Sequence, residues 1–122
     1  MAGERVLLVE DNEKNMKLLR DVLTAKGYVV LEATSGEEAV TRAAADDPGL
    51  VLMDVQLPGI DGVEALRRVR ADARTARIPV LALTAQAMDG DRERFLAAGF
   101  DGYLSKPVDI VELLATVASY VR

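Results

Sequence analysis

Three carboxylates, one hydroxyl and one ammonium group follow four separate apolar runs of the sequence. They belong to Glu10, Asp11, Asp54, Thr84 and Lys106. A single acid after an apolar run is usually a loop residue or a helix cap, but a coincidence over four runs is far rarer. Two carboxylates about 4 Å apart repel by about 4 kcal/mol at an effective dielectric constant of 20. A divalent cation and the ammonium group would relieve this repulsion, and a small set of oxygen ligands favours Mg²⁺.

Asp54 has the neighbours that a nucleophilic carboxylate needs. A carboxylate can form an aspartyl-phosphate intermediate. The incoming phosphoryl oxygens then need a metal ion and a cation to neutralise their charge. Lys106 supplies the cation, and the Thr84 hydroxyl can donate a hydrogen bond to a phosphoryl oxygen. The residue types therefore predict a site that accepts a phosphoryl group on Asp54 with Mg²⁺ bound beside it.

Composition narrows the classes of protein to consider. The chain has 122 residues, which suits one domain, and half of them are hydrophobic. A net charge of −5 argues against a nucleic-acid partner. The absence of Cys and His excludes disulfides, Ser-His-Asp chemistry and a phosphohistidine on this chain. No apolar run approaches the roughly 20 residues that span a bilayer, and no signal peptide is present, so we expect a cytoplasmic protein without a membrane partner.

Five short apolar runs predict strands. Their length, their Val and Leu content and their lack of alternation indicate strands that are buried on both faces. The predicted strands are Val6–Val9, Val29–Ala33, Leu50–Met53, Val80–Leu83 and Tyr103–Leu104.

Each run is followed by a helical pattern. Asn15–Lys26 has one apolar face, and Gly27 is the predicted stop. Ser35–Glu38 reads as a capping box, and Asp61 and Asp109 are N-caps of later helices.

A further helix is predicted from about Asp89 to Ala98, ended by Gly99. The order is therefore (βα)₅. It predicts an α/β fold, a doubly wound five-stranded parallel sheet of the flavodoxin-like order 2-1-3-4-5. Ligands of such sheets bind at the carboxyl ends of the strands, where the strand order reverses. Because the five units use residues 1–122, we expect one domain and no output domain.

Four motifs resemble those of CheY-like response-regulator receivers of two-component systems. They are Val9–Asn12, Met53–Gly62, Leu83–Ala85 and Ser105–Pro107. The resemblance covers essentially the whole chain. More narrowly, Val-Glu-Asp-Asn-Glu-x-Asn-Met-Lys-Leu near the start and Thr-Ala-x-Ala-Met-x-Gly-Asp after the fourth strand are similar to single-domain receivers of the DivK type.

The resemblance implies a role for each matching residue. Asp54 would be the phosphoacceptor, Lys106 the phosphate-binding lysine, and Thr84 with Tyr103 the switch pair. The implied Mg²⁺ ligands are Glu10, Asp11, Asp54 and the backbone carbonyl of Gln56. Glu10 departs from the Asp-Asp pair common in the family, which affects the metal geometry and not the function. The resemblance also implies a cis bond between Lys106 and Pro107.

The implied partners are proteins. A sensor histidine kinase or a histidine phosphotransfer protein would donate the phosphoryl group. A downstream protein would read the surface formed by the fourth helix, the fifth strand and the fifth helix. The domain would catalyse only its own phosphorylation and dephosphorylation, and would not otherwise be an enzyme. The arginines of Arg67–Arg77 are interpreted as a solvated helix face.

Three alternatives stay open at this point. The chain could be a receiver excised from a larger regulator or hybrid kinase. A haloacid-dehalogenase-type phosphatase also uses an Asp nucleophile and Mg²⁺, but its Asp-x-Asp pattern is absent after Val9. A flavodoxin-type cofactor binder needs a hydroxyl- and Gly-rich phosphate loop after the first strand, and Asp11–Lys14 is not one.

Overall fold

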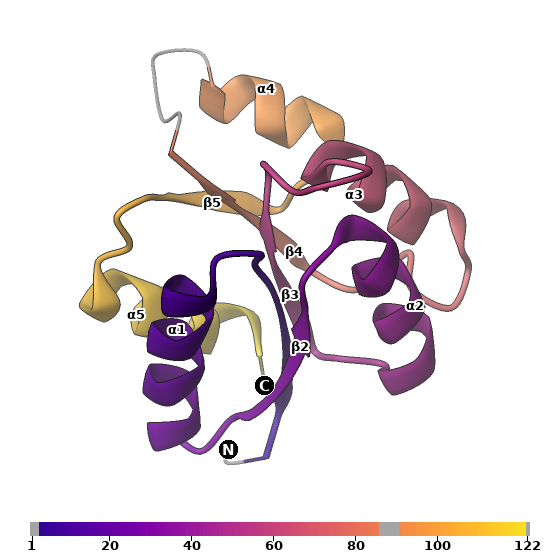
Figure 1. The fold of residues 1–122 in the computed structure, drawn as a ribbon. Helices are drawn as coiled ribbons and strands as arrows, with labels where there is room; N and C mark the ends of the chain where they lie inside the picture. The colour runs from indigo at the N-terminus through magenta and orange to yellow at the C-terminus, as the bar shows by residue number, and fades with distance from the viewer. Residues whose placement is uncertain (1–2, 86–90, 122) are drawn as a thin grey trace.

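Strands and helices alternate along the chain in the computed structural model, which describes residues 3–85 and 91–121. Within those ranges there are five strands and five helices (Figure 1). Their bounds are β1 Arg5–Val9, α1 Glu13–Ala25, β2 Val29–Ala33, α2 Gly36–Asp46, β3 Leu50–Asp54, α3 Gly62–Ala71, β4 Val80–Thr84, α4 Asp91–Ala98, β5 Gly102–Ser105 and α5 Ile110–Tyr120. Each predicted strand is present and agrees to within one residue at either end.

The strands form one parallel sheet in the order β2-β1-β3-β4-β5. This is the predicted doubly wound order, with β3 at its centre and β1 beside it. The carboxyl ends of neighbouring parallel strands reach the same edge of a sheet, so side chains that follow β1, β3, β4 and β5 are brought together there.

Helices cover both faces of the sheet, so there are two cores (Figure 1). Successive strand side chains point to opposite faces. In β1, Val6 and Leu8 pack with residues of α1 and α5, whereas Leu7 and Val9 pack with residues of α2, α3 and α4. This alternation decides on which face each site residue emerges.

The predicted burial of the strands holds for the centre of the sheet and is wrong for its edges. All residues of β3 and β4 are buried. The edge strands β2 and β5 are only partly covered, because each has a neighbour on one side alone. Among the helices that the structure describes, none is long and apolar enough to cross a bilayer.

Local capping signals place the helix ends. The side chains of Ser35, Asp61 and Asp109 accept the N–H of the residue three positions later, as predicted. The first helix begins at Glu13, two residues before the prediction, because the Asn12 side chain caps it by accepting the Asn15 N–H.

Glycines end two helices. Gly27 and Gly99 follow α1 and α4, and both have positive φ, a conformation that glycine adopts at little cost. Of the predicted fourth helix, Asp89 and Gly90 lie outside the described residues. The Lys106–Pro107 bond is cis, as predicted.

The solvated arginine face is predicted correctly only in part. Arg67, Arg68 and Arg74 are exposed and pair with Glu64 or Asp72. Arg70 differs, because its side chain is only 25% exposed and its guanidinium joins α3 to more distant segments.

Candidate functional site

The predicted site residues gather at the carboxyl edge of the sheet. Asp54 and Thr84 are the last residues of β3 and β4. The Glu10 N–H donates to the Ala33 carbonyl, which extends the β1–β2 ladder by one residue. The Lys106 N–H likewise donates to the Thr84 carbonyl beyond the end of β5. Regular strand geometry therefore brings together residues that are distant in the sequence.

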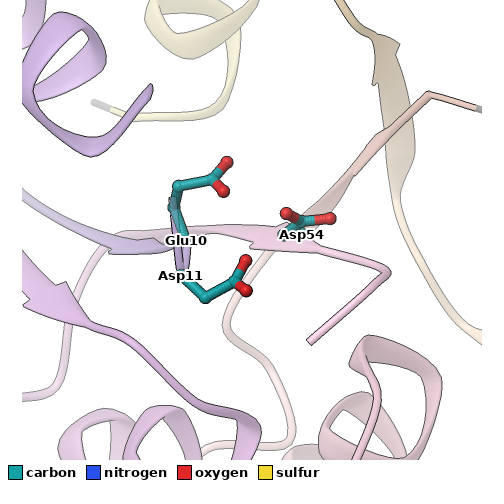
Figure 2. A group of neighbouring side chains, drawn as sticks. All are labelled: Glu10, Asp11 and Asp54. Atoms are coloured by element: carbon teal, nitrogen blue, oxygen red, sulfur yellow. The ribbon is translucent and has the colours of Figure 1, made fainter. Parts of the chain in front are cut away.

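Three carboxylates form the centre of this group. One oxygen each from Glu10, Asp11 and Asp54 lies within 4.8 Å of the others. Glu10 and Asp11 leave the end of β1 on opposite sides, and both carboxylates extend toward Asp54 (Figure 2). Glu10 is 1% exposed and Asp54 5%, whereas Asp11 is exposed. The site is therefore a mostly buried acidic group that solvent reaches from the Asp11 side.

Lys106 supplies a positive charge to this group. Its Nζ lies 2.8 Å from Asp54 Oδ2 and 3.0 Å from Glu10 Oε1. One ammonium group against three carboxylates leaves a net negative charge when all are ionised. A divalent cation would offset that excess, and proteins hold Mg²⁺ with a few carboxylate and carbonyl oxygens together with water. The spacing and chemistry of the carboxylates thus fit such an ion.

Burial and hydrogen bonding shift the pKa values of Glu10 and Lys106 in opposite directions. Burial raises the pKa of the Glu10 carboxyl, and hydrogen bonds from Lys106 and the Asn12 N–H reduce this rise without cancelling it. Burial alone would lower the pKa of Lys106, but its hydrogen bonds to Asp54 and Glu10 outweigh that effect and raise the pKa. Lys106 is therefore fully charged at neutral pH.

The loop after β3 approaches the acidic group through its backbone. The Gln56 N–H donates to Asp54 Oδ1 at 3.0 Å, while the Gln56 side chain is exposed. Gly62, which begins α3, permits this close packing, because a Cβ there would lie 2.5 Å from the Asp54 carbonyl oxygen. The helix start and the end of β3 can be this close only when residue 62 lacks a side chain.

Thr84 and Tyr103 lie on the same face of the sheet. Tyr103 pairs in register with Ala82, two residues before Thr84, so alternation directs both side chains toward α2, α3 and α4. Thr84 is buried and Tyr103 half-buried. The Tyr103 ring packs against Phe95 of α4, with ring centroids 6.2 Å apart. The two residues of the predicted switch pair therefore share the face that carries α4.

Sequence reasoning missed two features of the site. The Asn12 N–H donates to Glu10 Oε2 at 3.1 Å, so the residue that caps α1 also orients a site carboxylate. Its place three residues before Asn15 is an N-cap signal that could have been read. A cavity of about 390 Å³ also opens beside the site, between α1 and the segment after β5. It is lined by Glu10, Asn15, Leu18, Leu19, Ala85, Lys106, Pro107 and Val108.

Comparison with known proteins places these features in a family. Residues 6–118 match the family model of the response regulator receiver domain. The polar-differentiation response regulator DivK of Brucella ovis is 44% identical over 116 residues, which is 95% of this chain and 94% of the relative.

Solved structures agree with this match. The receiver domain of a sensor histidine kinase from Pseudomonas aeruginosa, with a magnesium ion coordinated in its active-site cleft, is 40% identical, has a TM-score of 0.90 and covers 98% of each chain. A chemotaxis response regulator of Vibrio cholerae is 28% identical, with a TM-score of 0.91 over 98% of this chain and 100% of that one. The Saccharomyces cerevisiae Ssk1 receiver, crystallised with the phosphotransfer protein Ypd1, is 29% identical, with a TM-score of 0.89 over 98% of this chain and 90% of that one. The chain therefore belongs to the response-regulator receiver family of two-component and phosphorelay signalling.

Proposed function

We propose that this domain is a phosphorylation switch that accepts a phosphoryl group on Asp54. One observation carries the proposal: the Asp54 carboxylate is buried at a strand end, 2.8 Å from an ammonium group and beside two further carboxylates. Nucleophilic carboxylates and phosphoryl transfer both require such an arrangement.

We assign Mg²⁺ to the acidic group as its cofactor. Glu10, Asp11, Asp54 and the Gln56 carbonyl would hold the ion. Mg²⁺ would neutralise charge on the phosphoryl oxygens during transfer. The magnesium ion in the similar Pseudomonas aeruginosa receiver supports this assignment.

The side chains of the site then divide the chemistry. An Asp54 carboxylate oxygen forms the new bond to phosphorus while the bond from phosphorus to the donor's histidine nitrogen breaks. Lys106 is already beside Asp54 and offsets the negative charge of the phosphoryl group. The Thr84 hydroxyl donates to a phosphoryl oxygen, which couples the phosphoryl group to β4.

The donor is a phosphohistidine outside this domain. This chain contains no histidine, so it cannot form that intermediate itself. The similarity to the Ssk1 receiver, which was crystallised with a histidine phosphotransfer protein, supports a phosphotransfer protein or a sensor histidine kinase as the donor. A second protein would read the surface of α4, β5 and α5.

The same chemistry would serve a single-domain regulator or a receiver within a longer protein. Similarity to DivK favours the first, and similarity to the receiver of a sensor histidine kinase favours the second. The assignment of 1–122 to one receiver without an output domain stays a prediction, as does a cytoplasmic location. We propose no turnover of external phosphate esters, so the domain acts as a switch and not as a phosphatase.

Replacement of the acceptor tests this function. Asp54→Asn should abolish Mg²⁺-dependent uptake of acid-labile phosphate from acetyl phosphate, because the amide is a poor nucleophile, while the circular dichroism spectrum stays unchanged. Asp61→Asn is the matched control, since it makes the same change at an exposed helix cap. Uptake by the Asp54 variant at the wild-type rate would show that another residue accepts the phosphoryl group.

A further inference from the structure

Glu10 and Lys106 emerge on the same face of the sheet. Continuing the alternation of β1, Glu10 follows Leu8 onto the face that carries α1 and α5. Lys106 follows Leu104 of β5 onto that same face. Both residues line the cavity between α1 and the segment after β5. Strand geometry thus directs Glu10 toward Lys106, while Asp11 leaves β1 on the opposite side (Figure 2).

Both oxygens of the Glu10 carboxylate have partners. Oε1 accepts from Lys106 Nζ at 3.0 Å, and Oε2 accepts from the Asn12 N–H at 3.1 Å. The side chain is 1% exposed, so packing also restricts it. A buried carboxylate held at both oxygens has a fixed direction, and here that direction is toward the ammonium group of Lys106.

The length of the Glu10 side chain makes this contact possible. β1 and β5 are separated by β3 and β4, so Lys106 must cross toward the centre of the sheet to reach Asp54. An aspartate at position 10 would be shorter by about 1.5 Å, the length of one C–C bond. Its oxygen would then lie about 4.5 Å from Lys106 Nζ, which is too far for a hydrogen bond.

We propose that Glu10 is a positioning residue that holds Lys106 beside the phosphoacceptor. This inference rests on the proposed function of Asp54. When a phosphoryl group occupies Asp54, the contact between Lys106 and Asp54 Oδ2 must change, but the contact with Glu10 can persist. Glu10 therefore keeps the ammonium group in place on both sides of the reaction, a role separate from binding the metal ion.

A metal-free measurement tests the contact itself. Unfolding in EDTA is measured for wild type, Glu10→Asp, Lys106→Met and the double variant. Glu10→Asp should raise the unfolding equilibrium constant about threefold or more when Lys106 is present, and less than twofold when it is Met. Glu13→Asp, the same change at an exposed position, should show no such dependence on Lys106. Equal effects in both backgrounds would overturn the proposal.

A second measurement separates the two roles of Glu10. Glu10→Asp keeps the charge and loses the reach, whereas Glu10→Gln keeps the reach and loses the charge. Mg²⁺ affinity, measured by calorimetry, should fall more in Glu10→Gln. The rate of phosphorylation by acetyl phosphate at saturating Mg²⁺ should fall more in Glu10→Asp, by about tenfold.

The same rank order in both measurements would mean that Glu10 acts through the metal ion alone. A wild-type protein that takes up no phosphate would refute the proposed function. The EDTA measurement would still decide whether Glu10 holds Lys106.

Discussion

The three site carboxylates differ in their access to water although they lie together. Glu10 and Asp54 are buried, and both are paired with Lys106. Asp11 is exposed, so solvent screens its charge. The repulsion within the group is therefore reduced by a lysine on one side and by water on the other.

Removal of the Asp11 charge should stabilise the protein without metal. In EDTA, Asp11→Asn relieves repulsion with two neighbouring carboxylates, and we expect a gain of about 1 kcal/mol after screening. Mg²⁺ affinity should fall at the same time, because a ligand is lost. Denaturant unfolding in EDTA and calorimetry with Mg²⁺ check the two effects.

Glu13→Gln is the matched control for Asp11→Asn. It changes the net charge equally at an exposed residue of α1 and should leave stability in EDTA within about 0.5 kcal/mol of wild type. A clear loss of stability in the Asp11 variant would mean that Asp11 is held by a favourable structural interaction.

At the scale of elements, Arg70 connects segments that the sequence separates widely. Its guanidinium donates to the carbonyls of Ile78 and Gly99 and to the carboxylate of Asp101. Asp101 also accepts the Val80 N–H at the start of β4. Arg70 of α3 thus ties the end of α4 to the starts of β4 and β5, at the edge of the sheet opposite the acidic group.

Loss of this connection should destabilise the domain. Arg70→Met removes the guanidinium that donates to the Ile78 and Gly99 carbonyls and leaves Asp101 with the Val80 N–H, and we expect a cost of about 2–3 kcal/mol in urea unfolding. Arg67→Met is the control. Arg67 is exposed and pairs only with Glu64 among the contacts described, so its loss should cost much less than the loss of Arg70. Similar costs for both variants would show that Arg70 is also a surface charge.

Arg67 contacts a residue three positions away, whereas Arg70 contacts residues 29 and 31 positions away, and the sequence predicts the first kind of contact better than the second. Helix caps such as Ser35 and Asp61 act on residues three positions away, so local patterns located them. The partners of Arg70 at Gly99 and Asp101 are 29 and 31 residues away, and those of Lys106 are 52 and 96 residues away. No local pattern contains such contacts. The position of Lys106 can be predicted because parallel strands bring their carboxyl ends to one edge, whereas no such rule predicts the contacts of Arg70.

At the scale of the whole molecule, the sheet divides the site between its two faces. Asp54, Glu10 and Lys106 emerge toward α1 and α5, and Thr84 and Tyr103 toward α2, α3 and α4. A phosphoryl group on Asp54 would therefore form on one side of the sheet and be sensed on the other. Thr84 ends β4, the strand that pairs with β3, and so lies between the two faces beside Asp54.

This arrangement predicts that Thr84 carries the signal. A phosphoryl oxygen that accepts from the Thr84 hydroxyl would draw the end of β4 inward and change the space beside Tyr103, which packs against Phe95 of α4. The segment that follows, at residues 86–89, lies outside the described part of the chain. Since packed interfaces switch between discrete arrangements, we expect two states of α4 and β5.

Hydrogen exchange with and without beryllofluoride, a phosphoryl mimic, tests this route. In wild type the mimic should change exchange in α4 and β5 by about 5- to 150-fold, the effect of a coupling energy of 1–3 kcal/mol. Thr84→Ala should still bind the mimic at Asp54, seen by fluorine NMR, but lose most of that change. Thr24→Ala, at an exposed position of α1, should behave as wild type. An undiminished change in Thr84→Ala would mean that the signal leaves Asp54 by another path. The loop after β3 would be the next to test, because the Gln56 N–H donates to Asp54 Oδ1.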